Sequence, residues 1–311
     1  MRLSSFVLRL IARHLIIDFG HDYRDVVFVA GSARSGTTWL SNIINYKNEY
    51  RYVFEPFRKS KVAICRGFRD RQYLRPDNRD AAFLIPAESI LRGKVRSRWI
   101  DAHNRKIVSQ RRLIKDIRAN LLLKWMYVTF TGVPIILLLR HPCAVASSRL
   151  RQQWDPTAVL RDTLGQADLL NDFLYPFRTE IERANTVFEK LIFLWCIENY
   201  VPLKQFKPGE VCVVFYEDLC RQPRRAIARL FLFLGKEVEE PVYAVLSEPS
   251  STSAEWSAIL SKDDVVNAWR KVISDEMTKR AGEILSLFGL ERLYSSGAMP
   301  CVENPDVDVF L

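Results

Sequence analysis

The stretch DVVFVAGSARSGTTWL, residues 25–40, decides the fold of this chain. It begins with a short apolar run that ends in Gly31, and after a tight loop a helical pattern starts at Thr37. In such a strand, loop and helix, backbone N–H groups and the positive end of the helix point at one place and bind an anion. Gly31 and Gly36 allow the loop to turn and its backbone to approach a ligand closely. We therefore predict a phosphate-binding loop in this stretch.

The side chains of the loop add groups that suit an oxyanion. Ser35, Thr37 and Thr38 carry hydroxyl donors, and Arg34 has a planar fork suited to phosphate or sulfate oxygens. The spacing is close to the nucleotide P-loop, but Thr37 stands where that motif has lysine. The later apolar run PIILLL also ends in Arg140, where a Mg²⁺-dependent nucleotide enzyme has aspartate. A kinase or NTPase is therefore an alternative, and a serine-rich turn without a ligand is another.

Further apolar runs bounded by turn signals indicate more strands. These strands are predicted at 111–119, 134–140 and 211–216, and helical patterns lie at 156–172, 184–205, 222–235 and 262–288. Continuous apolar strands alternating with helices are typical of a parallel sheet covered on both faces. The predicted fold class is α/β, a parallel β-sheet flanked by helices, with a P-loop-like strand, loop and helix. Because no linker is visible, we predict one domain over 25–290, followed by a C-terminal tail over 291–311.

The N-terminal segment, residues 1–24, contains an apolar run interrupted by Arg9, Arg13 and His14. The run is too short and too charged to span a bilayer. We predict an amphipathic helix packed on the domain, with peripheral contact to a membrane surface as the alternative. The six cysteines are scattered without metal-ligand spacing, which indicates reduced thiols in a cytoplasm and no metal site.

The net charge of +10 is unevenly distributed. Between Arg58 and Arg118 there are 18 Lys and Arg residues against 6 Asp and Glu residues. This basic stretch either attracts anionic ligands or forms a solvated basic surface. Aromatic residues are not interleaved with the basic ones and no nucleic-acid motif is present, so nucleic acid is not an expected partner. The sequence leaves the oligomeric state open.

A second anion motif begins at Arg140, which ends a predicted strand and precedes a helix that starts with His141-Pro142. Proline suits the first turn of a helix because its missing N–H would have no partner there. Ser148 follows the arginine by eight residues, and an arginine and a serine so placed can converge on one anion. Ser147 is the alternative at this position.

These motifs resemble those of the sulfotransferases that use 3′-phosphoadenosine 5′-phosphosulfate (PAPS), and most closely the carbohydrate-type and bacterial sulfotransferase-domain proteins. R-S-G-T-T-W resembles their 5′-phosphosulfate loop, and R-H-P-C-A-V-A-S-S resembles their 3′-phosphate motif. The strand, Tyr-Glu-Asp-Leu and helix over 210–235 are a third match. The resemblance implies a sulfotransferase fold related to the P-loop NTPases, with PAPS as the donor and no metal. It assigns the donor to Arg34, Ser35, Gly36, Thr37, Thr38, Trp39, Arg140, Ser148 and Tyr216, with Trp39 against the adenine. Glu217 and Asp218 are expected to cap a helix.

The resemblance also implies a base that takes the proton of the acceptor hydroxyl. In the phenol and steroid type a histidine does this, but Ile117 stands at the matching position here. Phe-Glu-Pro at 54–56 resembles the carbohydrate type, in some members of which the glutamate is the base, so we predict Glu55. Burial would have to raise its pKa toward neutrality, and a structural pairing of Glu55 with Arg51 or Arg58 is the alternative. Lys115 and Arg118 match a K-x-x-R pattern of the carbohydrate type, which implies that they bind the acceptor or stabilise the transferring charge; the alternative is that they face solvent. Arg34 and Lys115 are expected to stabilise the charge that passes to the leaving phosphate.

The predicted function is transfer of a sulfuryl group from PAPS to a hydroxyl of a small-molecule or glycan acceptor, most consistent with carbohydrate sulfation. Two alternatives remain from the sequence. One is a P-loop kinase or NTPase that lacks its lysine, and the other is a non-catalytic module that binds a nucleotide or a membrane.

Overall fold

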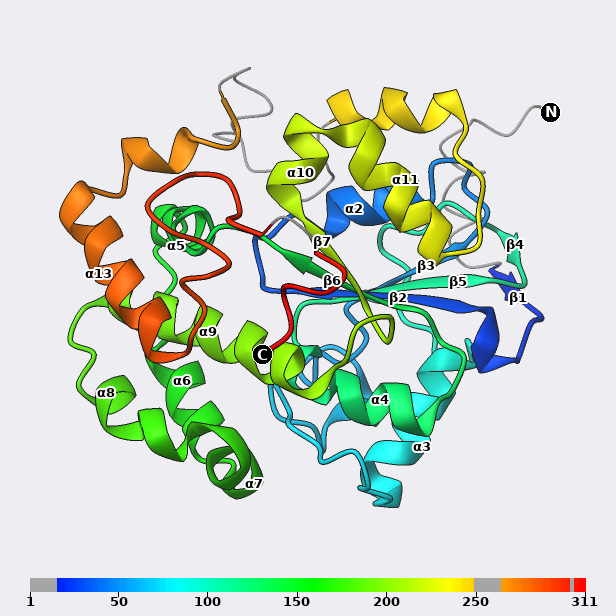
Figure 1. Cartoon of the computed structure of the whole chain (residues 1–311). Helices are drawn as coiled ribbons and strands as arrows, with labels where there is room; N and C mark the ends of the chain where they lie inside the picture. Colours follow the sequence, from blue (N-terminus) through cyan, green and yellow to red (C-terminus); the bar gives the residue numbers. More distant parts are fainter. Residues whose placement is uncertain (1–15, 249–263, 303–304) are drawn as a thin grey trace.

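A computed structural model of the chain describes residues 16–248, 264–302 and 305–311. Its centre is a five-stranded sheet in the order β3-β5-β2-β6-β7, and every neighbouring pair is parallel (Figure 1). The strands are β2 (Val26–Gly31), β3 (Arg51–Phe54), β5 (Arg112–Asp116), β6 (Ile135–Leu139) and β7 (Cys212–Phe215). The predicted parallel α/β sheet is confirmed, and its central strand β2 is buried along its whole length, as its unbroken apolar run indicates.

Helices cover both faces of the sheet (Figure 1). Alternate residues of a strand point to opposite faces, and in β2 Val27 and Val29 pack on one face while Phe28 and Ala30 pack on the other. The first face is covered by α2 (Thr37–Ile44), α10 (Tyr216–Arg221) and α11 (Pro223–Phe233). The second is covered by α3 (Ala81–Leu91), α4 (Leu123–Thr129), α5 (Pro142–Arg151), α9 (Val187–Gln205) and α13 (Asp275–Leu287).

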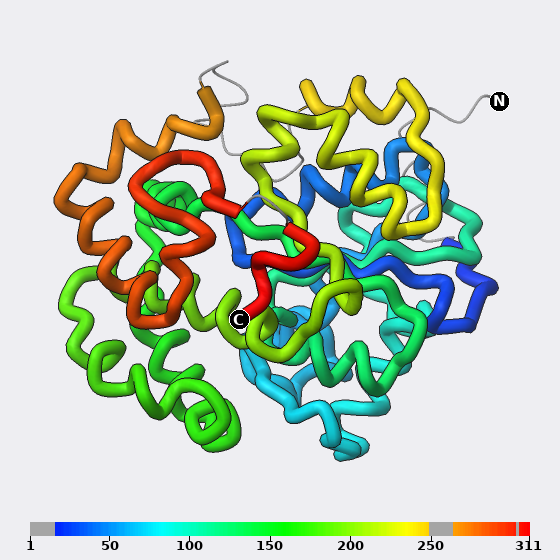
Figure 2. Tube along the Cα trace, viewed as in Figure 1, coloured from blue at the N-terminus to red at the C-terminus, as the bar shows by residue number. Residues whose placement is uncertain are grey.

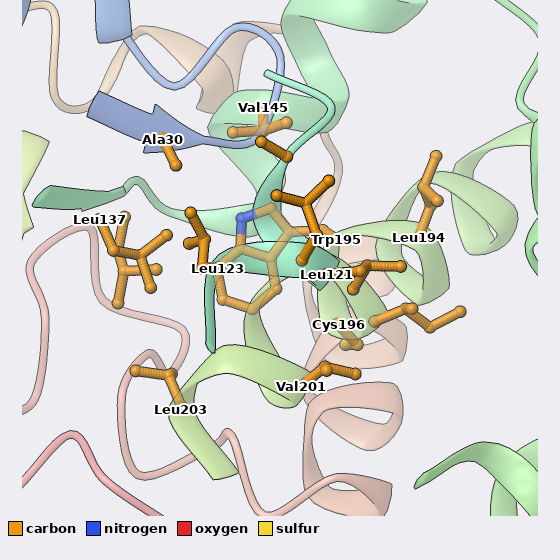
Figure 3. Close-up of a cluster of buried hydrophobic side chains, with 14 of the residues drawn as sticks. Ala30, Leu121, Leu123, Leu137, Val145, Leu194, Trp195, Cys196, Val201 and Leu203 are labelled. Atoms are coloured by element: carbon orange, nitrogen blue, oxygen red, sulfur yellow. The ribbon is translucent and has the colours of Figure 1, made fainter. Parts of the chain in front are cut away.

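Helix α9 is the centre of the larger core. Figure 3 shows Trp195 of α9 surrounded by apolar side chains from the sheet and from α4, α5 and the same helix. A capping box formed by Thr186 and Glu189 fixes the start of this helix. The indole Nε1 of Trp195 donates to the carbonyl oxygen of Arg140 at 3.0 Å. The core therefore holds the backbone of a predicted donor residue in place.

Two predicted helices are shorter in the structure than in the sequence patterns. The pattern over 156–172 is divided into α6 (Thr157–Leu164), α7 (Ala167–Leu169) and a π-helical turn (Leu170–Leu174), with α8 (Arg178–Glu182) further on. Gly165 ends α6, because it breaks the helical run that the apolar spacing suggested. Of the pattern over 262–288, the regular helix is α13, and Ser274 caps its start.

The predicted N-terminal helix over 1–24 falls largely on residues outside the described part of the chain. For residues 16–24 the helix prediction is wrong, because Ile17–Asp18 form strand β1, which pairs in parallel with β4 (Val108–Ser109). The carboxylate of Asp18 accepts hydrogen bonds from the buried Arg51 and Arg112 at 3.0 and 2.6 Å, and these ion pairs hold the segment in an extended form. Among the described residues, no helix has the length and apolar character needed to cross a membrane.

The C-terminal segment, predicted as a tail over 291–311, packs on the rest of the fold. Leu293, Tyr294 and Val309 have no exposed surface. The segment runs back across the molecule and ends beside α9, where the N–H of Leu311 donates to the carbonyl oxygen of Leu203 (Figure 2). It therefore contributes directly to the core.

Candidate active site

The candidate site lies where four parallel strands end at the same edge of the sheet. The loop after β2, Glu55 after β3, the turn after β5 and Arg140 after β6 all leave the sheet there. This edge is where open α/β sheets bind their ligands. Residues that are far apart in the sequence are thereby brought together, as the motifs require.

The predicted phosphate loop, residues 31–38, has a backbone that requires its glycines. Gly36 is the N-cap of α2 and has a φ of 99°, in the left-handed region. A Cβ atom on Gly36 would lie 2.7 Å from the ring of Tyr216, and one on Gly31 would lie 2.6 Å from the carbonyl oxygen of Leu138. The start of α2 has no side-chain cap, so its first N–H groups face the loop without such a partner.

Several buried polar atoms around this loop lack hydrogen-bond partners among the described residues. They are Ser35 Oγ, Trp39 Nε1 and Arg140 Nε. Buried polar groups in folded proteins are nearly always paired, because an unpaired one costs about 1–3 kcal/mol. The loop therefore has the donors that a phosphosulfate group would need, and its residues fit that group.

The two predicted anion motifs meet in space. Arg34 Nε donates to Ser148 Oγ at 3.0 Å, and Arg140 Nη1 donates to the carbonyl oxygen of Arg34 at 3.1 Å. The guanidinium of Arg140 lies 4.1 Å from the ring centroid of Tyr216, whose ring is 5.3 Å from that of Trp39. All the predicted donor residues are thus gathered around one loop, with an aromatic pair beside it.

Glu217 has a role that the sequence did not predict. Helix α10 has no side-chain cap, so the expected capping by Glu217 and Asp218 is wrong. Its buried carboxylate instead accepts hydrogen bonds from the N–H of His141 at 2.9 Å and from the hydroxyl of Tyr294 at 2.8 Å. Burial raises the pKa of Glu217 to about 7, and burial also lowers the pKa of His141 to about 4. Glu217 and Tyr294 together support the backbone of His141, which follows Arg140.

The candidate base, Glu55, is held by two cations. Its Oε1 accepts from Lys115 Nζ at 2.7 Å and its Oε2 accepts from Arg118 Nη1 at 2.7 Å. Its partners are therefore not Arg51 or Arg58. Burial favours a higher pKa for Glu55, but the charges and hydrogen bonds of Lys115 and Arg118 outweigh it, so the pKa lies below its ordinary value. The carboxylate is ionised at neutral pH, and the raised pKa that the predicted role as a base requires is not met in this state.

Backbone strain is concentrated around this site. Within residues 16–248, 264–302 and 305–311, five non-glycine residues have a positive φ, and three of them are Arg34, Glu55 and Arg71, at 75°, 42° and 61°. Such conformations cost on the order of 1–3 kcal/mol each and persist where the surrounding structure enforces them. The strained backbone therefore indicates that the geometry of this region serves function more than stability.

A buried ion-pair network below the loop was missed by the sequence analysis. Glu198 of α9 accepts from Arg71 Nε at 2.5 Å and from Arg149 Nη2 at 3.2 Å. Arg149 Nε in turn donates to the carbonyl oxygen of Ala33 in the phosphate loop at 3.2 Å. The available signal was the pair Glu198-Asn199 in the otherwise apolar run FLWCIENYV, because a charge in a buried helix needs a partner.

Comparisons with known proteins decide the family. The model of a family described as "Sulfotransferase domain" matches residues 24–285. The chain belongs to the sulfotransferase domain family. No curated protein matches it significantly. The predicted family is confirmed, and with it the assignment as a sulfotransferase enzyme.

Several solved structures of sulfotransferases are also similar to this chain. A sulfotransferase domain from a Synechococcus olefin synthase is 18% identical with a TM-score of 0.47, covering 84% of this chain and 94% of that one. A mouse sulfotransferase complexed with PAP is 15% identical with a TM-score of 0.43, covering 92% and 89%. A sulfotransferase from Alicyclobacillus acidocaldarius is 17% identical with a TM-score of 0.43, covering 86% and 94%.

Cys, His, Asp and Glu residues do not gather into a metal site in the described part of this sulfotransferase. Within those residues, no group of three or more of these side chains is placed to hold a metal ion. The charges at the site are instead arginine, lysine and carboxylate side chains.

Proposed function

We propose that this sulfotransferase transfers a sulfuryl group from PAPS to a hydroxyl group of its acceptor. The observation that carries the proposal is the meeting of two anion motifs, through the hydrogen bond from Arg34 to Ser148 and that from Arg140 to Arg34. Two adjacent anion sites, each with its own arginine, suit a nucleotide that carries one phosphate on the 3′ oxygen and another on the 5′ oxygen of its ribose. The aromatic pair of Trp39 and Tyr216 offers a face for a base beside them.

Each predicted donor residue has a proposed role. PAPS, when bound, supplies an activated sulfuryl group on a phosphosulfate anhydride. The N–H groups at the start of α2 and the hydroxyls of Ser35, Thr37 and Thr38 would hold the phosphosulfate, with Arg34 on its oxygens. Arg140 and Ser148 would hold the 3′-phosphate.

Glu55 is proposed to take the proton of the acceptor hydroxyl. An anionic donor beside Lys115 and Arg34 competes with Glu55 for positive charge, and this competition raises the pKa of the carboxyl from its lowered value. Once Glu55 holds the proton, its ion pair with Lys115 weakens. Lys115 Nζ is then available to the charge that develops on the leaving phosphate.

The acceptor class follows from the resemblance of Phe-Glu-Pro at 54–56 to the carbohydrate type. We propose a carbohydrate or glycan-like acceptor with a free hydroxyl. A cytoplasmic location, with or without contact to a membrane surface, stays a prediction.

Turnover measurements test the proposal. We would follow transfer of ³⁵S from labelled PAPS to a panel of glycans and small hydroxyl compounds. Arg34→Ala is expected to lower the rate about 10²–10³-fold. This is the usual effect of removing one hydrogen-bond donor to the charge that develops in a transition state. Glu55→Gln is expected to lower it about 10²–10⁴-fold.

The matched control is Arg224→Ala, because Arg224 is exposed and pairs with the exposed Glu240 away from the site. This variant should keep full activity. Full activity in Arg34→Ala, with an unchanged circular dichroism spectrum, would refute the assignment of the phosphate loop.

A further inference from the structure

A cavity of about 290 Å³ lies beside the phosphate loop, and its lining is rich in arginine. The charged residues that line it are Arg34, Arg58, Arg71, Arg118, Arg149 and Asp70. We call it the arginine cavity. It adjoins the loop through Arg34, and it adjoins the candidate base through Arg118, whose Nη1 bonds to Glu55. The cavity is therefore placed where an acceptor would meet both groups.

Three of these arginines form ion pairs with carboxylates, but the carboxylates are too few to neutralise them. Arg71 and Arg149 share Glu198. Arg118 pairs with Glu55 at 2.7 Å and with Asp70 at 3.5 Å. Five guanidinium groups thus have three carboxylates near them, one of which, Glu55, is also shared with Lys115, so the cavity keeps an excess of positive charge.

Arg58 contributes to this excess. Its guanidinium lies 4.6 Å from the ring centroid of Trp99, and it makes no ion pair with any carboxylate of the described residues. Arg149 is a second indication that the cavity binds an anion. Its side chain is only 2% exposed, and its Nη1 has no hydrogen-bond partner within the described structure. A buried guanidinium N–H without a partner is costly, and an oxyanion in the cavity would satisfy it.

We propose that the arginine cavity binds an oxyanion of the acceptor, so that the acceptor is an acidic molecule with a carboxylate, sulfate or phosphate near its reacting hydroxyl. This inference rests on the proposed function, which assigns Arg34 to the donor and so leaves Arg58 for the acceptor. The cavity has room for an anionic group and part of the ring or chain that carries it.

The test uses the full chain saturated with PAP, so that the donor site is filled. Malonate is titrated at low ionic strength by calorimetry, with inorganic sulfate as a second anion and malonamide as the neutral counterpart of malonate. We expect malonate to bind and malonamide not to bind. Arg58→Ala should weaken malonate binding about tenfold or more, as expected for loss of a charged hydrogen bond. A preference for sulfate over malonate would identify the acceptor's anion as a sulfate or phosphate.

Arg66→Ala is the matched control, because Arg66 is an exposed arginine of the same basic stretch and does not line the cavity. It should leave malonate binding unchanged. Absence of binding to the PAP-saturated protein, or equal binding in both variants, would overturn the inference. Malonate binding that PAP abolishes would also overturn it, because the anion would then occupy the donor site.

PAP affinity separates this inference from the proposed function. We expect Arg58→Ala to bind PAP as tightly as the unmodified protein. A similar loss of PAP and malonate affinity would assign Arg58 to the donor and overturn the inference while the proposed function stands. Failure of the unmodified protein to bind PAP would instead refute the proposed function. In turnover, acids such as glucuronate should be favoured at least tenfold over their amides, and equal rates would contradict the inference.

Discussion

The two sides of this site differ in how their buried polar groups are satisfied. Around the phosphate loop, Ser35 Oγ, Trp39 Nε1 and Arg140 Nε have no hydrogen-bond partner in the described structure. Around the arginine cavity, Glu55 and Glu198 are buried and each holds two cations within 3.2 Å. The loop side is incomplete by itself. On the cavity side the buried carboxylates are fully paired, and Arg149 Nη1 is left as a donor without a partner in the described structure.

The difference indicates which groups bind ligands and which position them. Each unpaired buried polar group lowers the stability of the folded protein. Several such groups around one loop therefore indicate that they bind a ligand. A closed ion-pair network contributes geometry instead, because removal of one member leaves the others charged and buried. We infer that the loop side is completed by the donor. On the cavity side, Glu55 and Glu198 fix the strained backbone, while Arg58 and Arg149 Nη1 stay available to an anion of the acceptor.

The largest expected effect is that of Glu198→Ala on stability. Loss of this carboxylate leaves Arg71 and Arg149 buried without their partner, which should lower the free energy of unfolding by about 3–5 kcal/mol. Glu182→Ala is the control, because Glu182 pairs with Arg178 on the exposed surface, where a pair is worth roughly 0–1 kcal/mol. Urea denaturation measures both. Equal losses of unfolding free energy in the two variants would contradict the assignment of the buried Glu198 network as a stabilising part of the cavity side.

The second prediction concerns pH and uses two buried glutamates with opposite surroundings. Burial raises the pKa of Glu217 to about 7 from its ordinary value of 4.5, whereas the two arginines beside Glu198 outweigh its burial and lower its pKa. A carboxyl with a raised folded-state pKa makes the folded protein less stable as the pH rises from about 4.5 to about 7. Between pH 5 and pH 8, Glu217→Gln should therefore gain roughly 2 kcal/mol of unfolding free energy relative to the unmodified protein.

Urea denaturation at the two pH values checks this difference. The titration of His141 occurs in both proteins and cancels in the comparison. If the difference between the variant and the unmodified protein is the same at pH 5 and pH 8, Glu217 does not titrate in this range, and its contrast with Glu198 is lost.

The smallest expected effect is that of Ser35→Ala. Removing a buried hydroxyl without a partner should raise the free energy of unfolding by on the order of 1 kcal/mol in the ligand-free protein. The same change should reduce the stabilisation given by PAP, because the hydroxyl is assigned to the donor. Thermal denaturation with and without PAP measures both. A loss of stability without ligand would show that the hydroxyl has a structural partner.

The sequence predicted the strand, loop and helix around residues 31–38 because their signal is local. A strand, a loop and a helix within sixteen residues fix both the fold class and the positions of Arg34 to Thr38. The closeness of Arg140 and Ser148 to this loop could also be predicted, because a strand and a helix hold them at a fixed spacing.

The cavity side was only partly predicted because its contacts cross the chain. The ion pair of Arg71 with Glu198 joins residues 127 positions apart, and no periodicity specifies such a pair. The N–H of Tyr73 likewise bonds to Gln166, which lies in a connection without a motif. Glu55 was predicted as a candidate base from its motif, but its lowered pKa depends on Lys115 and Arg118, whose distances only the fold determines.

Binding of PAP tests the central claim most directly. A thermal-shift titration of the unmodified protein with PAP, and separately with ATP and Mg²⁺, distinguishes the two phosphate sites from an ordinary nucleotide P-loop. A ligand at about 100 times its Kd stabilises the folded state by about 2.7 kcal/mol. We predict that PAP stabilises the protein and that ATP with Mg²⁺ does not. Stabilisation by ATP with Mg²⁺ and none by PAP would contradict the donor site and favour a kinase or NTPase.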